Sequence, residues 1–324
     1  MTTQTMTSVR AKPRLRREEG ETGHERKSGP LSHISVMVDE ALTLLDLKKG
    51  DVVVDGTLGM GGHSFAMLKE APVTVVSFDA DPDAVAAGRD RLKQFGERSK
   101  IINANFADLT AALAKEGIDT INKALFDLGW NKEQLASGRG FSFLRDEPLS
   151  MSYGKKPASG FTAAEILNTW EEKVIADVLF GYGEERFARR IAKAIVERRD
   201  LKPFETTIEL VETIRDAVPA PYRHGKLHFA TKSFQALRIA VNDELGVIER
   251  GLKGAWEVLA PGGRIVVITF HSIEDRLVKK TFVALAKKDA RLLTKKPLVA
   301  TRTEITHNAS ARSAKMRAVE KKSE

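Results

Sequence analysis

The sequence predicts an α/β fold, a mostly parallel sheet flanked by helices, with an inserted all-helical domain. Three observations support this prediction. Strand and helix signals alternate from residue 51 to Asp127, helix signals alone then follow, and the alternation returns after about residue 226. Such alternation indicates parallel strands with helices on both faces of the sheet. A chain of 324 residues is also long enough for a core domain and an insertion.

The first α/β segment begins near His33, where a short amphipathic helix over Val36–Leu45 opens it. Apolar runs then predict strands at 51–56, 73–79, 99–103 and 121–127, and the segments between and after them predict helices at 62–70, 82–95 and 107–116. These elements account for the chain up to Asp127.

The next segment carries helix signals without strands. Residues 128–160 form a long loop rich in Gly, Ser and Lys. Two capping boxes, Thr162–Glu165 and Thr169–Glu172, predict two helix starts. A third helix is predicted near Glu184, and a fourth from Thr206 to Pro219.

The α/β pattern then returns. We predict a helix over 229–259, broken near Gly246 to Gly254, then a turn, an apolar strand over 265–270 and a helix from Ser272. Residues 291–320 supply two more strands. The expected organisation is a disordered basic tail over 1–30, an α/β domain over 31–130 and 226–320, and a helical insertion over 131–225.

Composition limits the classes of function. The chain has no cysteine, which excludes disulfides and thiolate chemistry and fits a cytoplasmic protein. No apolar run approaches the roughly 20 residues that span a bilayer, so we expect no membrane partner. The seven histidines lack metal-ligand spacing, so we expect no metal. The net charge of +8 favours a polyanionic partner.

A glycine-rich turn follows the first predicted strand. Asp55 ends that strand, and the turn contains Gly59, Gly61 and Gly62 before the next helix. Asp79 ends the second strand about 20 residues after Gly59, the spacing of a carboxylate that binds a ribose diol. This layout favours an adenosine-containing cofactor. The alternative is a glycine turn without a ligand.

Asp127 and Trp130 follow the fourth predicted strand, at the edge where open parallel sheets bind ligands. An exocyclic amine on a base is a poor nucleophile because its lone pair is delocalised into the ring. A carboxylate that accepts from the N–H group can localise that lone pair, and an aromatic ring can stack on the base. Both residues are therefore catalytic candidates for amine methylation. Trp130 has the alternative role of a packing residue.

His271 and Ser272 follow the apolar strand over 265–270 and are further catalytic candidates. Ser272 is equally well placed to cap the next helix, and local spacing places no Asp to complete a Ser–His triad.

Basic residues of the insertion are candidates for phosphate contacts. Arg186, Arg189, Arg190 and Lys193 lie on adjacent faces of one predicted helix. The alternative is an ordinary solvated helix face, partly compensated by Glu184 and Glu185.

Many ordered motifs of this chain match one known family. They are Val54-Asp55-Gly56-Thr57, Gly61-Gly62-His63-Ser64, Asp79-Ala80-Asp81-Pro82, Asn105-Phe106, Asp127-Leu128-Gly129, Arg139-Gly140-Phe141-Ser142-Phe143, Tyr182-Gly183-Glu184-Glu185-Arg186, Phe234-Gln235-Ala236-Leu237-Arg238, Asn242-Asp243-Glu244-Leu245, Phe270-His271-Ser272-Ile273-Glu274 and Arg312-Ser313-Ala314-Lys315. The chain resembles the bacterial S-adenosylmethionine-dependent methyltransferases that modify the exocyclic N4 of a cytidine in small-subunit ribosomal RNA. The resemblance covers residues 33–320.

The resemblance implies a Rossmann-like methyltransferase sheet with an inserted substrate-recognition domain. It implies that Gly61, Gly62 and His63 line the S-adenosylmethionine, that Asp79 holds the ribose and that Phe106 flanks the adenine. The set of cofactor residues that we expect is Asp55, Gly59, Gly61, Gly62, His63, Asp79, Phe106, Asp127 and Gln134. Arg312 and Lys315 join the candidates for RNA contacts.

Three loops depart from the family pattern. The family has Val-Ser-Ser-Pro at 130–133, Asp-Met-Arg-Met-Asp near 150–154, and Asn-Pro-Arg where this chain has Asn308-Ala309-Ser310. All three lie on the expected substrate side, whereas the cofactor side is intact.

The expected function is methylation of the N4 amine of a cytidine in 16S rRNA, within the small ribosomal subunit. Two alternatives stay open: a ribosome-assembly factor that binds rRNA without catalysis, and a nicotinamide-dependent oxidoreductase. The sequence leaves open whether the protein is a monomer or a homodimer, and whether naked RNA suffices as substrate.

Overall fold

A computed structural model describes residues 34–129, 137–154 and 156–323 of the protein. The predicted basic tail, Trp130 and Gln134 lie outside the described residues. Among those residues, no helix is both long and apolar enough to cross a membrane.

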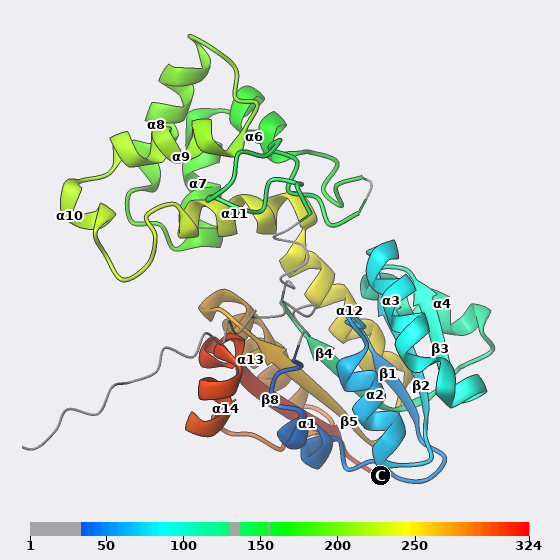
Figure 1. Ribbon diagram of the computed structural model, residues 1–324. Coiled ribbons are helices and arrows are strands. Elements are labelled where there is room, and N and C mark those ends of the chain that lie inside the picture. Colours follow the sequence, from blue (N-terminus) through cyan, green and yellow to red (C-terminus); the bar gives the residue numbers. More distant parts are fainter. Residues whose placement is uncertain (1–33, 130–136, 155, 324) are drawn as a thin grey trace, which may run out of the picture. The chain divides into compact units, whose positions relative to one another are not determined.

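Within the described residues, the strands form one sheet in the order β3-β2-β1-β4-β5-β8-β6, with β7 also paired to β8 (Figure 1). The strands are β1 (Val52–Asp55), β2 (Thr74–Asp79), β3 (Ser99–Asn103), β4 (Ile121–Asp127), β5 (Leu259–Thr269), β6 (Ala290–Leu292), β7 (Leu298–Val299) and β8 (Lys315–Lys321). Strands β1 to β5 pair in parallel, whereas β8 runs antiparallel to β5. The predicted mostly parallel α/β sheet is confirmed.

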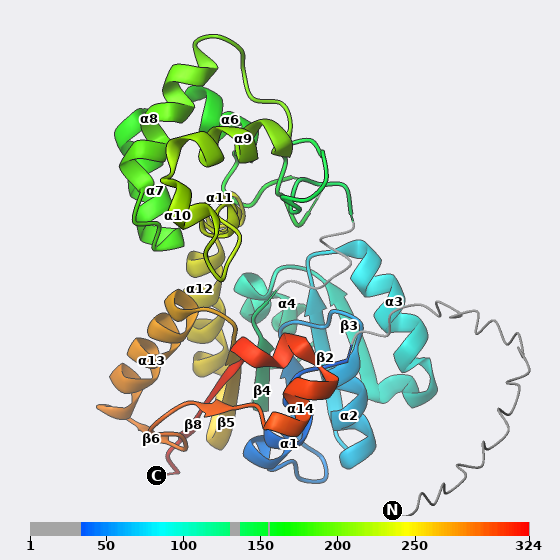
Figure 2. The ribbon, with the colours of Figure 1, turned by 60° about the vertical axis from the view of Figure 1, so that its left-hand side comes forward.

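Helices cover both faces of this sheet. They are α1 (Val38–Leu45), α2 (Gly62–Glu70), α3 (Pro82–Leu92), α4 (Leu109–Lys115), α12 (Glu244–Val258), α13 (Ser272–Ala286) and α14 (Arg302–His307), with 3₁₀ turns η1 (Lys93–Arg98), η2 (Phe106–Asp108) and η3 (Ala309–Ser313). Figure 2 shows α1 and α14 close to each other, and the backbone N–H of Met37 donates to Glu304 across that contact.

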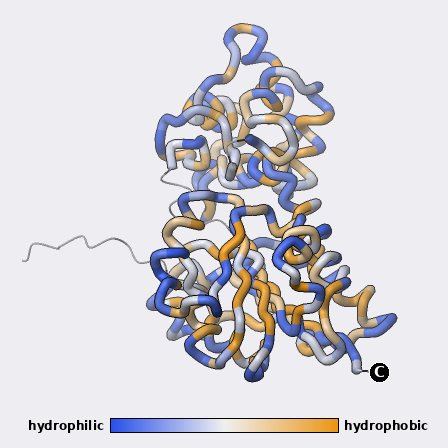
Figure 3. Tube along the Cα trace, turned by 90° about the vertical axis from the view of Figure 1, so that its right-hand side faces the viewer, coloured by the Kyte–Doolittle hydropathy of each residue, from blue (hydrophilic) through white to orange (hydrophobic). Residues whose placement is uncertain are grey.

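The two faces result from the strand period of two residues. Val53 and Val75 pack on one face with α1 and α2, and the next residues, Val54 and Val76, pack on the other with α4, α12 and α13. Strands buried on both faces are mostly apolar, which gives the orange strands at the centre of the sheet in Figure 3.

The remaining helices form a core of their own. They are α6 (Ala163–Thr169), α7 (Glu172–Gly183), α8 (Ala188–Arg199), α9 (Thr207–Ala217), α10 (Ala220–Arg223) and α11 (Thr231–Asn242). Their shared apolar cluster extends from Phe141 to Val241. Helix α11 therefore packs with the insertion, although the sequence placed residues after 225 in the α/β domain. We propose a two-part division with its second boundary at Asp243.

The break in the predicted helix over 229–259 lies at Asp243, not at the glycines further on. Asp243 has φ 46°, a left-handed conformation that ends α11 and begins α12. An aspartate tolerates this region better than most residues, which explains why glycine positions were a poor guide.

Two predicted helix starts were wrong, and one cap was misassigned. Thr169 ends α6, and its hydroxyl donates to the Glu165 carbonyl, so it caps nothing. Glu184 is the left-handed C-cap of α7, and α8 starts only at Ala188. His271, not Ser272, caps α13, because its ring accepts from the Glu274 backbone N–H. The chain end supplies three strands and α14 instead of two strands.

Candidate active site

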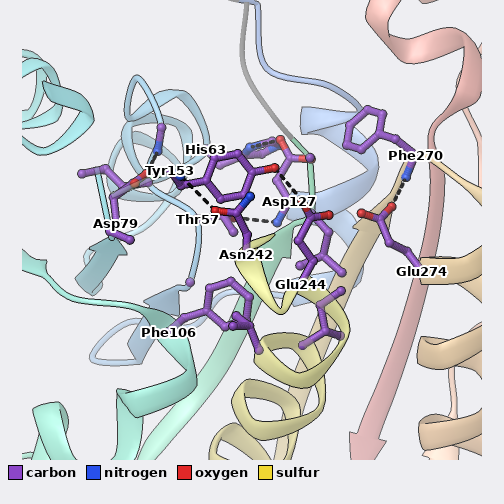
Figure 4. Close-up of a pocket in the computed structure, with 18 of the residues that line it drawn as sticks. Thr57, His63, Asp79, Phe106, Asp127, Tyr153, Asn242, Glu244, Phe270 and Glu274 are labelled. Carbon is purple, nitrogen blue, oxygen red and sulfur yellow. Dashed lines mark hydrogen bonds and ion pairs between the residues drawn. The ribbon is translucent and has the colours of Figure 1, made fainter. Parts of the chain in front are cut away.

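The site is a cavity of about 450 Å³ at the carboxyl ends of the parallel strands. The sequence-predicted residues Gly59, Gly62, His63, Asp79, Phe106 and Asp127 all line it. Figure 4 shows the side chains of His63, Asp79, Phe106 and Asp127 together with those of residues that the sequence did not single out: Tyr153, Asn242 and Glu244.

The glycine loop is shaped by its backbone. Gly59 and Gly61 have φ 50° and 72°, where side chains are strained. A Cβ at Gly62 would lie 1.9 Å from the Ser35 hydroxyl, so no side chain fits there without a shift. Gly61 supports this turn as the cap residue before α2 and does not itself line the cavity.

Asp79 holds the loop in place. Its two oxygens accept from the backbone N–H groups of Gly59 and Asp81, each at 2.9 Å. The pKa of Asp79 is raised to about 6, mainly by burial; the nearby Asp81 and Asp55 carboxylates contribute to this rise, and the two hydrogen bonds oppose it. These hydrogen bonds fix both the loop and the Asp79 carboxylate, which lies in the wall of the cavity.

Asp55 lies behind the loop and does not line the cavity. It is fully buried, and its oxygens accept from the Ser64 hydroxyl at 2.6 Å and the Thr57 N–H at 3.1 Å. Burial raises the pKa of Asp55. The geometry makes Asp55 a support for the loop, whereas the sequence had suggested cofactor contact.

Phe106 forms an apolar wall of the cavity with Val247 and Ile248 of α12. Its ring lies 5.3 Å from that of Phe126 and sits against Gly251, where a Cβ would lie 2.3 Å from the Phe106 ring. The ring is thus held rigidly by a glycine 145 residues away in the chain, which leaves a flat apolar surface facing the cavity.

Asp127 ends β4 and lies beside His63 (Figure 4). Its Oδ2 is 3.6 Å from His63 Nδ1, and its Oδ1 is buried without a hydrogen-bond partner. Burial raises the pKa of Asp127 to about 6, opposed by the His63 ring and reinforced by the Asp55 and Glu274 carboxylates. A buried carboxylate oxygen without a donor is costly unless a ligand supplies one.

Four residues that the sequence did not predict for the site close the cavity. Tyr153 donates its backbone N–H to Asn242 and its hydroxyl to Glu244, both at 2.9 Å. Arg238 pairs with the same Glu244 through two hydrogen bonds of 2.8 and 3.0 Å. Arg238, Asn242 and Glu244 stand in motifs that carry the family resemblance, and that resemblance was the sequence signal that could have identified them. Tyr153 stands in a loop that departs from the family pattern.

A second cavity of about 200 Å³ shares residues such as Gly129 and Phe270 with the first. Phe141, Phe143 and Phe234 line it together with His271 and Glu274. The His271 Nδ1 accepts from the Glu274 backbone N–H, so its buried Nε2 carries the proton. That Nε2 lies 3.1 Å from Oε1 of Glu274, without the alignment of a hydrogen bond. The Glu274 carboxylate therefore attracts this proton at the wall of the aromatic cavity.

Ser272 lies on neither cavity. Its hydroxyl donates to Glu184 at 2.8 Å, and Arg276 donates to the other oxygen of Glu184. Ser272 therefore joins α13 to the end of α7. This contact favours a structural role over the catalytic role that the sequence suggested.

Glu244, His271 and Glu274 place candidate ligand atoms within 4.8 Å of one another, a cluster that sequence spacing did not reveal. The Glu244 oxygens already accept from Arg238 and Tyr153, and one Glu274 oxygen accepts from two backbone N–H groups. These contacts occupy lone pairs that a cation needs, so we derive no metal site from the cluster.

The predicted RNA-contact residues lie outside the two cavities. The guanidinium of Arg186 lies over the rings of Phe187 and Tyr222, at 4.9 and 4.7 Å. Arg189 and Arg190 are exposed on α8, and Lys193 pairs with Glu197. Near the chain end, Arg312 is exposed and Lys315 pairs with Asp275.

The chain is similar to known proteins along most of its length. The chain is 47% identical to "Ribosomal RNA small subunit methyltransferase H" of Carboxydothermus hydrogenoformans, over 90% of this chain and 98% of that protein. It is 45% identical to the protein of the same name in Geobacter sp., over 89% and 98%. A solved putative rRNA-methylase of Clostridium thermocellum gives a TM-score of only 0.42 at 12% identity, covering 89% of this chain and 99% of that one. The family model described as the MraW methylase family matches residues 30–322, and the chain belongs to that family.

Proposed function

We propose that this protein transfers a methyl group from S-adenosylmethionine to the exocyclic N4 amine of a cytidine in 16S rRNA. The observation that carries the proposal is the position of Asp127. Its carboxylate lies at the end of β4, in the same cavity as the glycine loop and Asp79, with one oxygen lacking a donor. An amine bound there would supply that donor.

The cavity fits the cofactor in three places. The Phe106 wall with Ile248 offers an apolar surface for an adenine ring. Asp79 offers a carboxylate for ribose hydroxyls. The orphaned Oδ1 of Asp127 calls for a donor or a positive charge, which the cofactor carries on its sulfonium and ammonium groups.

When bound, S-adenosylmethionine supplies the methyl group: the amine lone pair forms the N–C bond, the C–S bond breaks with its electron pair left on sulfur, and nitrogen releases one proton. The protein holds the amine in line with the methyl group, since alignment supplies most of the rate enhancement in such a transfer. The Asp127 carboxylate accepts a hydrogen bond from the amine N–H and thereby localises the lone pair on the amine nitrogen.

The second cavity is our candidate for the acceptor base. A cytosine taken out of its stack would lie against aromatic side chains such as Phe143 and Phe234. The Nε2–H of His271, which lies 3.1 Å from Glu274 without the alignment of a hydrogen bond, would donate to a ring nitrogen or carbonyl oxygen. The two cavities share Gly129 and Phe270, so base and cofactor meet there. Trp130, which lies outside the described residues, stays a predicted stacking residue.

The basic residues Arg186, Arg189, Arg190 and Lys193, with Arg312 and Lys315, are the proposed phosphate contacts. The partner is then the RNA of the small ribosomal subunit, and the protein acts in the cytoplasm.

Mass spectrometry of ribosomal RNA nucleosides, from cells with and without this protein, tests the function. We expect N4-methylated cytidine in 16S rRNA to disappear with the protein and to return with a plasmid-borne copy. Unchanged methylation together with a ribosome-assembly defect would support the non-catalytic alternative. Binding of a nicotinamide cofactor but not S-adenosylmethionine would support the oxidoreductase.

A further inference from the structure

His63 is held in one orientation by the segment before α1. Its Nε2 lies 3.0 Å from the Val36 carbonyl oxygen. The chain end fixes that segment, because Asn308 donates to the Ile34 carbonyl and Glu304 accepts from the Met37 N–H. Only 5% of His63 is exposed, so water competes little for this contact.

This contact determines where the ring carries its proton. A carbonyl oxygen only accepts, so the His63 Nε2 must be the protonated nitrogen, and in a neutral ring Nδ1 is left with a lone pair. That lone pair faces Oδ2 of Asp127 at 3.6 Å. The Asp127 carboxylate and the Nδ1 lone pair of His63 are both acceptors, so they form no hydrogen bond with each other until a proton is added to one of them.

We propose that His63 is the terminal proton acceptor of the methyl transfer, receiving through Asp127 the proton that the amine releases. This inference rests on the proposed function. The amine proton passes to Oδ1 of Asp127, rotation of the neutral carboxyl group turns that O–H toward Nδ1 of His63, and transfer to Nδ1 makes His63 an imidazolium and leaves Asp127 ionised. The Val36 carbonyl and the restored carboxylate stabilise that cation, and solvent removes the proton before the next turnover.

The charges around the pair suit this path. Asp127 faces the Asp55 and Glu274 carboxylates as well as His63, and burial raises its pKa to about 6. Asp127 is therefore ionised at neutral pH yet basic enough to take a proton. The 3.6 Å separation must shorten for transfer, as catalytic contacts do when substrate binds.

His63→Gln is the matched variant, because the glutamine amide can still donate to the Val36 carbonyl but offers Asp127 no basic atom. We expect near wild-type thermal stability and S-adenosylmethionine affinity, and a single-turnover methylation rate lower by at least about tenfold. His307→Gln, which alters an exposed imidazole on α14, should leave the rate unchanged.

A double-mutant cycle separates a relay from a structural role. If His63 acts through Asp127, adding His63→Gln to Asp127→Asn should cause no further loss of rate. Additive losses, or a wild-type rate in His63→Gln, would overturn the relay. A loss explained entirely by weaker cofactor binding would overturn it as well.

Nitrogen-15 NMR of histidine-labelled free protein gives a readout without catalysis. We expect the His63 signals of a ring protonated on Nε2 and unprotonated on Nδ1 at neutral pH. A ring protonated on Nδ1 alone contradicts the inference whatever the protein methylates. If wild-type protein fails to methylate small subunits while the NMR result holds, the proposed function fails instead.

Discussion

The cavity has a cofactor side, formed by the glycine loop and Asp79, and an acceptor side, formed by Tyr153, Arg238, Asn242 and Glu244. The two sides are built in different ways. Three hydrogen bonds that hold the glycine loop join residues 2 to 20 positions apart, as between Gly59 and Asp79, and one reaches from Thr57 to the Asp127 N–H. On the acceptor side, the two hydrogen bonds that Tyr153 donates to Asn242 and Glu244 join residues about 90 positions apart. A site can therefore combine a locally encoded half with a half that exists only after the insertion has folded.

This difference has consequences for substitution. Changes on the cofactor side should act on ligand affinity with little effect on folding, since the loop is held by many short-range backbone contacts. Changes on the acceptor side should act on stability and on RNA use. Asp127 lies where the two sides meet and should affect catalysis most.

Asp127→Ala should give the largest effect. We expect the single-turnover methylation rate to fall by about 10²–10⁴-fold, the range for losing a group that accepts a proton in the transition state. Thermal stability should change little, because Asp127 Oδ1 has no partner to lose. Exposed Asp119→Ala is the control. A rate within threefold of wild type would remove Asp127 from the chemistry.

Arg238→Ala tests the acceptor side. Arg238 and Glu244 are about 90% buried and paired, so removal of one partner should lower the free energy of unfolding by about 3–5 kcal/mol. Arg250→Ala breaks an exposed pair with Asp243 and should cost less than about 1 kcal/mol. Urea unfolding measures both. Equal losses would mean that the buried network does not hold the two parts of the site together.

Asp79→Ala tests the cofactor side. Loss of charged hydrogen bonds to the ribose should weaken S-adenosylmethionine binding by about 1–3 kcal/mol in calorimetry. The exposed Asp90→Ala should leave affinity unchanged. Wild-type affinity in Asp79→Ala would place the ribose elsewhere.

The pH dependence of cofactor affinity gives a further test. Burial raises the pKa of Asp79 and Asp127 from 3.8 to about 6, so both become protonated as the pH falls through 6. Donors on the cofactor favour the ionised carboxylates. Affinity should therefore be constant above pH 7 and fall below pH 6, by up to about tenfold per pH unit for each group.

The free protein should respond to pH in the opposite direction. A carboxylic acid whose pKa is raised by folding binds its proton more tightly in the folded state, so the contribution of Asp79 and Asp127 to the free energy of unfolding falls as the pH rises from 4 to 6; the difference in stability between the protein and its Asp79→Asn and Asp127→Asn variants isolates that contribution. Calorimetric scans without ligand test this sign.

For the bound state, an S-adenosylmethionine affinity that does not change from pH 8 to pH 5 would contradict ionised Asp79 and Asp127 carboxylates at the cofactor.

The smallest expected effect concerns the surface of the insertion. Changing Arg186, Arg189 and Arg190 to Gln should weaken RNA binding and reduce the slope of log affinity against log salt by up to about 2. Cofactor affinity should stay the same. An unchanged slope would make this an ordinary solvated helix face, and Arg186 a residue that only packs on Tyr222.

The sequence by itself determined the sheet and the cofactor side. Strands β3 and β4 and helix α2 have the predicted bounds, because apolar period and turn chemistry act over a few residues. The same local logic located Asp79 and Asp127 at strand ends. It also identified the capping box at Thr162 and the helix start at Thr206.

Only the tertiary structure decided the rest. The tautomer of His63 depends on a carbonyl 27 residues earlier, and that carbonyl is held by the chain end. The Tyr153 contacts depend on α11 packing with the insertion and on the left-handed turn at Asp243. No local pattern encodes such contacts, because their free energy is gained only when distant segments are buried together.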